Sequence, residues 1–448
     1  MIPLPHMSGK TVGVLGLGAS GLASAKALTA SGAAVLCWDD GEAARVKAAA
    51  QHLAVKPFSG ADVDLLISSP GIPLAYPAPN PITAQALEAQ VPVVGDVELF
   101  AKARAALPEH KVVGITGTNG KSTTTALIAH CLQSAGLDVQ IGGNFGPPIL
   151  SLDPVCDVFV LELSSFQLEI TNSLDCDVAV FLNLSPDHGD RYASMNDYAV
   201  AKQRLFDMQR AQHDAIIAVD DAEGQRLAAS VTGQVIPVSG SGRPARWTVR
   251  DGALWFENDV VSKQADWPAL KGHHNAQNAA AAAAACHQLG LSRDQIAKGL
   301  ASYEALAHRS QCVAQAGQLS FINDSKATNP EAAAQSLTAY DAVYWLAGGS
   351  DKGSAFDVLL EPAKSLRGAY FFGQTGPSMA DALGFPSETI FNDMKGACDA
   401  AVGAAQQAGG PATILLSPAC ASFDQFKNFA DRGDAFTQLA RGVERQAA

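Results

Sequence analysis

Short apolar runs alternate with helix-forming stretches along almost the whole chain. In the first series we expect an Ala-rich helix at residues 20–31 and strands at residues 11–16, 33–38, 63–68 and 91–94. Strands that alternate with helices in this way form parallel sheets with helices on both faces. A proline-rich loop covers residues 70–81, and the first α/β unit is expected to end near residue 98.

Two further series of apolar runs follow the first. The second has its runs at residues 112–116, 158–163, 178–182 and 216–219, and the third at 319–322, 343–346, 370–372 and 414–416. Asp251-Gly252 is a hairpin signal within residues 246–256. Seven consecutive alanines lie in an expected helix over 274–289. Ser292 with Gln295 predicts a capping box at the start of the next helix.

The chain of 448 residues is too long for one hydrophobic core. We predict an α/β protein of three domains. They are a Rossmann-like N-terminal domain at 1–98, a central domain with a mainly parallel sheet of the P-loop ATPase type at 99–305, and a Rossmann-like C-terminal domain at 306–448.

Charge and cysteine content narrow the class of protein. Lys plus Arg number 31 and Asp plus Glu 44, a net charge of −13, which argues against binding to a nucleic-acid backbone. No apolar run approaches the roughly 18 residues that a membrane span needs, and no signal peptide is evident. The eight cysteines form no C-x-x-C pair. We expect a soluble, cytoplasmic protein with reduced cysteines, and a monomer.

A first glycine loop follows the first expected strand. Gly16, Gly18 and Gly21 fit G-x-G-x-x-G, Ser20 lies within the motif, and Asp39-Asp40 end the next strand about twenty residues later. Such a loop presents free N–H groups at a helix N-terminus to a diphosphate. The alternative is a tight strand-to-helix turn without a ligand, and the motif by itself does not establish NAD.

A second glycine loop, at residues 114–122, is the strongest signal in the chain. It ends in Gly120-Lys121-Ser122, although Ile115 occupies a position where a strict Walker motif has glycine. A strand, a Gly-rich turn and a helix in this order place N–H groups around phosphate oxygens, with Lys121 as a point charge and Ser122 as a Mg²⁺ ligand. A surface loop with a chance lysine is the alternative.

Acidic and imidazole side chains follow in the same expected sheet. Glu162 lies in an apolar run, where an unpaired carboxylate is costly and a bound Mg²⁺ would offset that cost. Asp187 and His188 come directly after the next strand, at the edge of the sheet where ligands bind. The alternative for Glu162 is an ion pair with a lysine.

Together these motifs resemble the Mur ligases, ATP-dependent amide-forming enzymes of peptidoglycan synthesis. The resemblance covers nearly the whole chain and is greatest to the members that add D-glutamate to UDP-N-acetylmuramoyl-L-alanine. Besides the first loop, it rests on residues 69–72 (SPGI), 95–99 (GDVEL), 116–123 (TGTNGKST), 162–169 (ELSSFQLE), 323–329 (NDSKATN) and 416–422 (LSPACAS).

The resemblance implies a role for each matching residue. It implies that ATP is bound by Gly117, Thr118, Asn119, Gly120, Lys121, Ser122, Thr123, Asn275, Asn278, Arg309 and Asp324. It implies that the UDP substrate is bound by Gly16, Gly18, Ser20, Gly21, Asp39, Asp40, Ser69, Asn144 and His188. It implies that glutamate is bound by Thr328, Lys352, Ser422 and Phe429.

The resemblance also implies two Mg²⁺ ions, with Ser122, Glu162, His188 and a carbamylated Lys202 as ligands. Its catalytic residues would be Lys121, His188, Lys202 and Lys326. Without the resemblance, Lys202 would be interpreted as a solvated helical lysine. The implied reaction passes through an acyl phosphate and a tetrahedral intermediate, so the protein mainly positions groups and neutralises charge.

Two positions depart from the family pattern. Ser350-Asp351 replaces Asp-Gly before Lys352, and Gly41 stands where an arginine often follows the acidic residue that contacts uracil.

Alternative functions differ in which motif they leave unexplained. A folylpolyglutamate synthase-like ligase would begin directly with the phosphate loop, and an NAD-dependent oxidoreductase would not need residues 117–122. A nucleotide-switch protein would not need residues 323–329. Stereochemistry at the acceptor, D- or L-glutamate, stays open.

Overall fold

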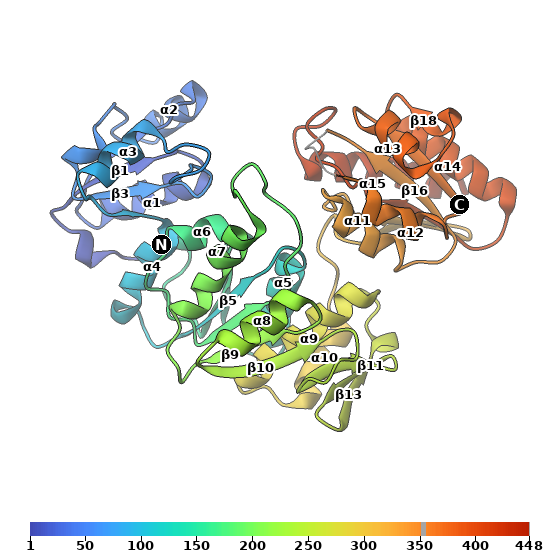
Figure 1. Cartoon of the computed structure of the whole chain (residues 1–448), viewed down its shortest axis with the longest axis horizontal. Coiled ribbons are helices and arrows are strands. Elements are labelled where there is room, and N and C mark those ends of the chain that lie inside the picture. Colours follow the sequence, from blue (N-terminus) through green and yellow to red (C-terminus); the bar gives the residue numbers. More distant parts are fainter. Residues whose placement is uncertain (351–354, 448) are drawn as a thin grey trace. The chain divides into compact units, whose positions relative to one another are not determined.

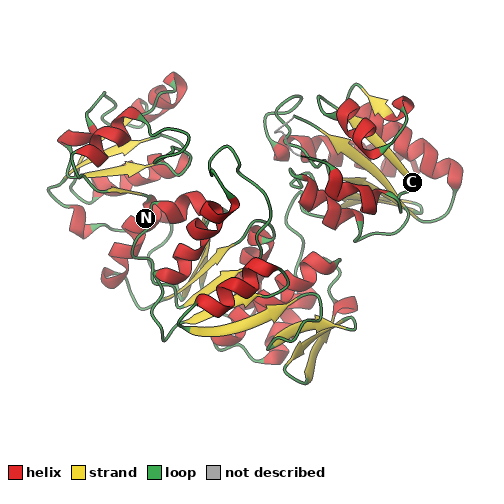
Figure 2. Ribbon diagram, viewed as in Figure 1, coloured by secondary structure: helices red, strands yellow, loops and turns green. Residues whose placement is uncertain are grey.

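The computed structural model describes residues 1–350 and 355–447, and these contain three β-sheets, one in each predicted domain range. The chain separates into two compact units. One holds Met1–Ser262 with Gln277–Leu300, and the other holds Lys263–Ala276 with the chain from Ala301 onward. Figure 1 traces the chain through both units, and Figure 2 shows that helices and strands alternate in each.

The N-terminal sheet has four parallel strands in the order β2-β1-β3-β4. Its strands are β1 (Thr11–Leu15), β2 (Ala34–Trp38), β3 (Leu65–Ser68) and β4 (Val93–Val94). Its helices are α1 (Ala19–Ala30), α2 (Glu42–Ala49), α3 (Pro81–Glu88) and α4 (Asp96–Ala103). The boundary expected at residue 98 falls inside α4. The predicted strands are confirmed in position and each differs by at most two residues at an end.

The central sheet has nine strands in the order β13-β12-β11-β10-β9-β8-β5-β7-β6. Its first five strands are β5 (Lys111–Thr116), β6 (Val139–Gly143), β7 (Val158–Glu162), β8 (Val178–Phe181) and β9 (Asp214–Ala218). Its last four are β10 (Gln234–Ser239), β11 (Trp247–Arg250), β12 (Ala253–Phe256) and β13 (Asp259–Lys263). From β6 to β11 neighbouring strands run parallel, so the carboxyl ends of β5, β7 and β8 share one edge.

The local signals in the central domain are confirmed. Strands β11 and β12 pair antiparallel around Asp251 and Gly252, whose φ angles of 50° and 70° match the left-handed turn that such a hairpin uses. Ser292 and Gln295 exchange the two hydrogen bonds of a capping box. The helices are α5 (Lys121–Ser134), α6 (Ser165–Glu169), α7 (Met195–Asp207), α8 (Ala222–Ser230), α9 (His273–Gln288) and α10 (Arg293–Ser302).

The C-terminal sheet has six strands in the order β14-β15-β19-β16-β17-β18, and only the β14–β15 pair is antiparallel. Its strands are β14 (Gln311–Ala316), β15 (Leu319–Asn323), β16 (Val343–Gly348), β17 (Gly368–Phe372), β18 (Ile390–Phe391) and β19 (Ala412–Leu416). Its helices are α11 (Pro330–Leu337), α12 (Leu360–Ala363), α13 (Gly376–Leu383), α14 (Met394–Ala408) and α15 (Phe429–Ala447). Apolar side chains are buried on both faces of the sheet.

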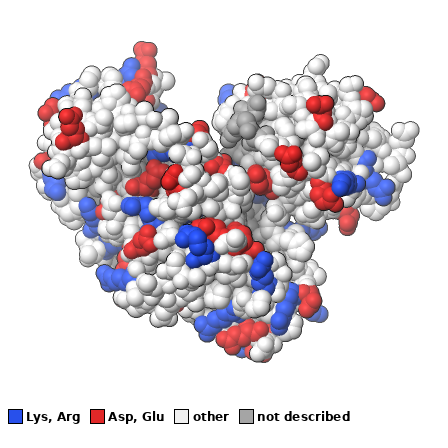
Figure 3. All heavy atoms as spheres, in the orientation of Figure 1, with Lys and Arg blue, Asp and Glu red and all other residues white. Residues whose placement is uncertain are grey.

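Two surface properties bear on the class of protein. Within the described residues, no helix combines the length and apolar character needed to cross a membrane. On the face shown in Figure 3, basic side chains lie interspersed with acidic ones.

Candidate active site

The second glycine loop joins β5 to α5 and has the backbone of a phosphate-binding turn. Gly117 and Gly120 have φ angles of 149° and 86°, which L side chains rarely adopt. A Cβ on Gly120 would also stand 2.3 Å from the Asn278 side-chain oxygen. Lys121 Nζ donates to the carbonyls of Gly117 (2.9 Å) and Thr118 (2.7 Å), so its charge lies over the loop. Thr123 is half-buried in the first turn of α5.

Glu162, the last residue of β7, is 2% exposed and faces this loop. Its carboxylate accepts hydrogen bonds from the Ser122 hydroxyl and from Asn144 Nδ2, the latter at 2.6 Å. Both donors are neutral, so they satisfy the oxygens without cancelling the charge. A carboxylate beside a serine hydroxyl at a phosphate loop is an oxygen donor set that suits Mg²⁺. The predicted metal residues Ser122 and Glu162 therefore fit the ion.

Lys202 lies in α7 and is 1% exposed, so its interpretation as a solvated lysine is wrong. Its Nζ donates to Gly117 O at 2.7 Å and stands 4.3 Å from the Tyr198 ring. Burial lowers the pKa of Lys202 well below its usual value, and Lys121 lowers it further, while Asp187 and Glu162 oppose the shift. Burial therefore disfavours the charged ammonium form of this side chain.

His188 follows β8 with a left-handed backbone, φ 55°, which is uncommon for a residue other than glycine. Its backbone N–H donates to Asp187 Oδ1 at 2.9 Å, and its ring centroid lies 4.8 Å from that of Phe166. Burial is the largest cause of the lowered pKa of His188, and the charges of Lys202 and Lys121 lower it further. A neutral imidazole is the form that binds metals. No three His, Cys, Asp or Glu side chains form a cation site among the residues that the structure describes.

The first glycine loop has the tight turn that its motif predicts. Gly16 has φ 86°, and its carbonyl accepts a hydrogen bond from Ser69 Oγ at 3.0 Å. A Cβ on Gly21 would stand 1.9 Å from that same carbonyl oxygen, so the helix can approach the loop only with glycine there. A Cβ on Gly18 would meet nothing within 4 Å, and this exposed residue leaves its backbone accessible to a ligand.

Asp39 and Asp40 hold the end of β2 beside this loop. The Asp39 carboxylate accepts from Leu17 N at 2.6 Å and Gly41 N at 2.7 Å. Arg45 Nη1 donates to the carbonyls of Asp39 (2.7 Å) and Asp40 (2.8 Å). The guanidinium of Arg45, in α2, thus lies at the end of β2. This is the place where the family pattern often has an arginine and this chain has Gly41.

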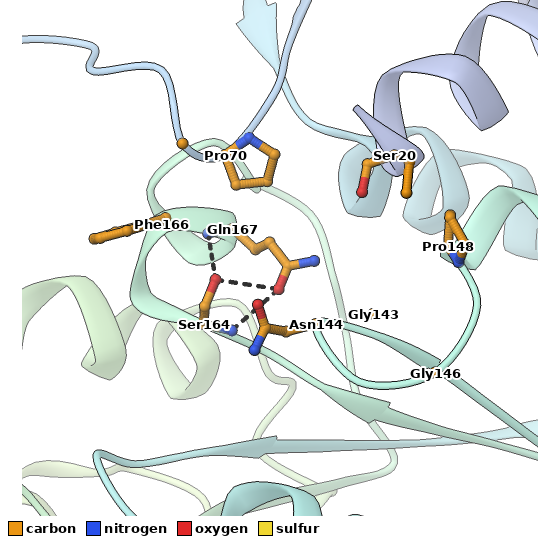
Figure 4. A pocket seen from close by; sticks show the side chains of 11 residues that line it. Ser20, Pro70, Gly143, Asn144, Gly146, Pro148, Ser164, Phe166 and Gln167 are labelled. Atoms are coloured by element: carbon orange, nitrogen blue, oxygen red, sulfur yellow. Dashed lines mark hydrogen bonds between the residues drawn. The ribbon is translucent and has the colours of Figure 1, made fainter. Parts of the chain in front are cut away.

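A cavity of about 340 Å³ lies between the N-terminal and central domains, within one compact unit. Figure 4 shows Ser20 and Pro70 on one side, with Asn144 and Gln167 opposite them. The predicted residues Ser20 and Asn144 therefore line one cavity. The other lining residues are Ala19, Gly71, Gly143, Gly146, Pro148, Ser164 and Phe166.

The second compact unit carries its own group of predicted residues. The Asp324 carboxyl accepts from Ser310 N at 3.0 Å and from the hydroxyls of Ser336 and Ser417. Lys326 Nζ stands 4.3 Å from the Phe429 ring. The predicted residues Asn275 and Ser422 are buried, and Thr328 and Arg309 are half-buried. Lys352 lies outside the described residues.

The sequence comparisons decide the family. Residues 115–286 match the family model of the Mur ligase middle domain. A UDP-N-acetylmuramoylalanine--D-glutamate ligase of Phenylobacterium zucineum is 44% identical over 97% of this chain and 97% of its own. One of Rhizobium meliloti is 43% identical over 99% of each chain. The chain belongs to the Mur ligase family.

Solved Mur ligases share the three-domain fold at low sequence identity. A MurF of Acinetobacter baumannii aligns over 97% of this chain and 91% of its own, with a TM-score of 0.63 and 18% identity. A MurF of Thermotoga maritima in complex with ADP aligns over 92% and 96%, with a TM-score of 0.63 and 16% identity. These likenesses show the fold of this Mur ligase.

Arg432 of this Mur ligase was not anticipated from the sequence. It is 0% exposed in α15 and donates to the carbonyls of Ser325 (2.8 Å), Cys420 (3.1 Å) and Gly348 (3.4 Å). Burial lowers its pKa to about 10. The guanidinium joins the loops after β15, β16 and β19, which carry predicted site residues. An arginine in an amphipathic helix gives no signal of such burial.

Gly21→Ala tests the close approach in the first loop. We expect a loss of about 2 kcal/mol in the free energy of unfolding, because the added methyl must displace the Gly16 carbonyl. Chemical denaturation measures it. The control Gly18→Ala, at φ −67° with open space, should change stability by less than about 0.5 kcal/mol. Equal losses for both variants would contradict the steric argument.

Asp324→Asn tests the buried carboxyl by pH dependence. Burial raises the pKa of Asp324 to about 6, with the hydrogen bonds and Arg309 only partly compensating. Because the folded-state pKa lies above the unfolded one, the ionised carboxyl costs stability that grows as pH rises from about 4 through 6. Urea unfolding should show the variant more stable at pH 8 by on the order of 2 kcal/mol.

At pH 4 most of that difference should vanish, since the carboxyl is then neutral in the folded state and only about half ionised in the unfolded one. Asp341→Asn, at an exposed position of the same unit, is the control and should show no such pH dependence. A stability difference for Asp324→Asn that is the same at both pH values would exclude a charge effect.

Proposed function

We propose that this Mur ligase is an ATP-dependent enzyme that adds D-glutamate to UDP-N-acetylmuramoyl-L-alanine in the cytoplasmic synthesis of peptidoglycan precursors. Relatives named UDP-N-acetylmuramoylalanine--D-glutamate ligase, at 42–45% identity over nearly the full length, support this reaction. The single structural observation that carries it is the phosphate loop, which gathers Lys121, Ser122, Glu162 and Lys202 around Gly117.

The three domains have separate roles in this proposal. The domain at 1–98 binds the UDP part of the substrate, with the diphosphate at Gly16, Gly18, Ser20 and Gly21 and the base near Asp39. The domain at 99–305 binds ATP at residues 117–123 together with Asn278. The domain at 306–448 contributes Arg309 and Asp324 to the binding of ATP and binds glutamate. The protein acts as a monomer.

The residues of the chain position two anionic reactants. Lys121 and the loop N–H groups orient the γ-phosphate for attack by the substrate carboxylate. The bond from the γ-phosphorus to the β,γ-bridging oxygen breaks, and the products of this step are an acyl phosphate and ADP. The amine of glutamate then attacks the acyl carbon, and phosphate leaves from the tetrahedral intermediate. Thr328, Lys352, Ser422 and Phe429 hold the amino acid, and Lys326 offsets the negative charge of the reacting groups. Asn144 and His188 contact the muramoyl part.

Mg²⁺ supplies positive charge at the phosphates, and its proposed ligands are Ser122, Glu162, His188 and Lys202. For Lys202 to act as a ligand, its neutral amine must react with CO₂ to give a carbamate. Two properties of the site support this modification. The low pKa leaves a nucleophilic lone pair, and burial disfavours the ammonium. A carbamate is an anion and suits a second Mg²⁺ ion.

Phosphate release tests the reaction directly. The protein is incubated with ATP, Mg²⁺ and UDP-N-acetylmuramoyl-L-alanine, and with D-glutamate, L-glutamate or neither. We expect release above background only with D-glutamate. No release with either acceptor would refute the ligase, and release only with L-glutamate would change the acceptor.

A further inference from the structure

Asn183, separated from the end of β8 by Leu182 alone, anchors the phosphate loop from the adjacent strand. Its backbone carbonyl accepts from Thr118 N at 2.9 Å. Its side chain accepts from Asn119 N at 2.8 Å through Oδ1 and donates to Asn119 O at 3.1 Å through Nδ2. One side chain therefore bonds with both backbone polar groups of Asn119, its N–H and its carbonyl. Gly117 and Gly120 leave the loop backbone conformationally permissive on both sides of Asn119. The hydrogen bonds with Asn183 therefore limit rotation of the backbone at Asn119.

The anchor is itself connected to a carboxylate through helix α9. The second hydrogen of Asn183 Nδ2 goes to Gln277 Oε1 at 3.0 Å. Gln277 Nε2 donates to Asp220 Oδ2 at 2.9 Å. Gly240 makes the docking of α9 possible, because a Cβ there would stand 2.4 Å from Gln277 N. All of these residues belong to one compact unit.

Asp220 is held in its ionised form. Burial raises its pKa, but hydrogen bonds from Ser239 Oγ, Ser241 Oγ, Gly240 N and Gln277 outweigh that effect and hold the pKa below its usual value. The first three donors lie at 2.6, 2.5 and 2.8 Å. An ionised carboxylate only accepts hydrogen bonds.

The charge therefore determines the direction of every hydrogen bond in the series. Gln277 must turn its NH₂ toward Asp220, so its oxygen faces Asn183. Asn183 must then turn its own NH₂ toward Gln277, which leaves Oδ1 for the N–H of Asn119. Either amide reversed would place two donors or two acceptors in contact, at a cost of about 1–3 kcal/mol.

We propose that Asp220, Gln277 and Asn183 form a positioning relay that sets the backbone orientation of the phosphate loop at Asn119. The consequence for phosphate binding rests on the proposed function, but the relay itself does not. Asn278, the next residue of α9, accepts from Thr124 Oγ1 at 3.2 Å and lies against Gly120. Helix α9 thus contacts the loop through two adjacent side chains.

Hydrogen exchange of the ligand-free protein tests the relay independently of activity. In Gln277→Leu, which keeps a similar volume without polar groups, we expect amide exchange of residues 117–120 to become at least about tenfold faster. Gln234→Leu is the matched control, because Gln234 is exposed on β10. It should leave exchange of the loop unchanged. Protection of 117–120 in folded Gln277→Leu equal to that of the wild type would overturn the proposal.

Binding of Mg²⁺–ADP, measured by calorimetry, gives the second readout. We expect the Kd of Gln277→Leu to rise about tenfold, and that of Gln234→Leu to stay within about twofold. If the wild type bound no ADP, the proposed nucleotide site would be wrong, while the exchange result would still decide the relay. A wild-type Kd in Gln277→Leu would overturn the relay as a determinant of phosphate binding.

Gln277→Glu provides a variant with a distinctive pH dependence. The introduced carboxyl faces Asp220, with Asp221 nearby on the same turn, and cannot donate when ionised. A proton shared with Asp220 restores a donor at this position. The Kd of the variant for Mg²⁺–ADP, divided by that of the wild type, should therefore fall at least about threefold from pH 8.5 to pH 6. A purely structural defect predicts a constant ratio, and that result would count against the relay.

Discussion

Replacing Lys202 with alanine is expected to lower the rate of D-glutamate-dependent phosphate release by about a thousandfold. The side chain is 1% exposed and its Nζ lies 2.7 Å from the carbonyl of Gly117 in the phosphate loop. Alanine removes both this contact and the amine that we propose to be carbamylated. Steady-state rates at saturating substrates measure the loss.

The carbamate has a signature of its own. Protein equilibrated with ¹³C-bicarbonate should show a carbamate resonance in the wild type that is absent from Lys202→Ala. Added bicarbonate or chloride should rescue the variant only in part or not at all. Lys298→Ala, at an exposed position of α10, serves as the control and should retain full activity. Unchanged activity in Lys202→Ala would exclude the carbamate.

Glu162→Gln is expected to lower the same rate by about a hundredfold to a thousandfold. Glutamine has the same shape and can still bond with Ser122 and Asn144, so the fold should be kept. It removes the negative charge from a 2%-exposed site beside the phosphate loop, and with it the proposed Mg²⁺ ligand. Activity titrated against Mg²⁺ should show a higher half-saturating concentration.

Thermal denaturation separates this loss from unfolding. The Tm of Glu162→Gln should stay at or above that of the wild type, because the buried carboxylate accepts hydrogen bonds from the neutral side chains of Ser122 and Asn144, with which glutamine can also bond. Glu257→Gln, in an exposed ion pair with Arg246, is the control and should retain its activity and its Mg²⁺ dependence. A Mg²⁺ dependence that is the same in Glu162→Gln and the wild type would exclude Glu162 as a metal ligand.

Three of the strands that the sequence did not reveal share a physical reason. Strands β6, β10 and β14 contain polar or small residues such as Gln140, Pro237 and Gln315, so their apolar periodicity is weak. They form because a neighbouring strand supplies hydrogen-bond partners, which a single segment cannot indicate. By contrast, β5 and β7 are continuous apolar runs buried between helices, and their periodicity identified them.

The same distinction applies to single residues. Lys121 and Ser122 were identified because the loop motif fixes their position relative to the strand and the helix. Arg45 and Arg432 were not, because a helical arginine looks the same in sequence whether it is solvated or lies against backbone carbonyls. Their roles depend on loops that are distant along the chain.

The sequence by itself determined the α/β class, the two glycine loops and the residues that can bind phosphate, because these depend on local periodicity and backbone permissiveness. The tertiary structure alone decided the burial of Lys202 and its lowered pKa, the cavity that joins Ser20 to Asn144, and the relay from Asp220 to Asn119. Desolvation and hydrogen-bond direction depend on what surrounds a side chain. Those surroundings come from segments that meet only when the chain is folded.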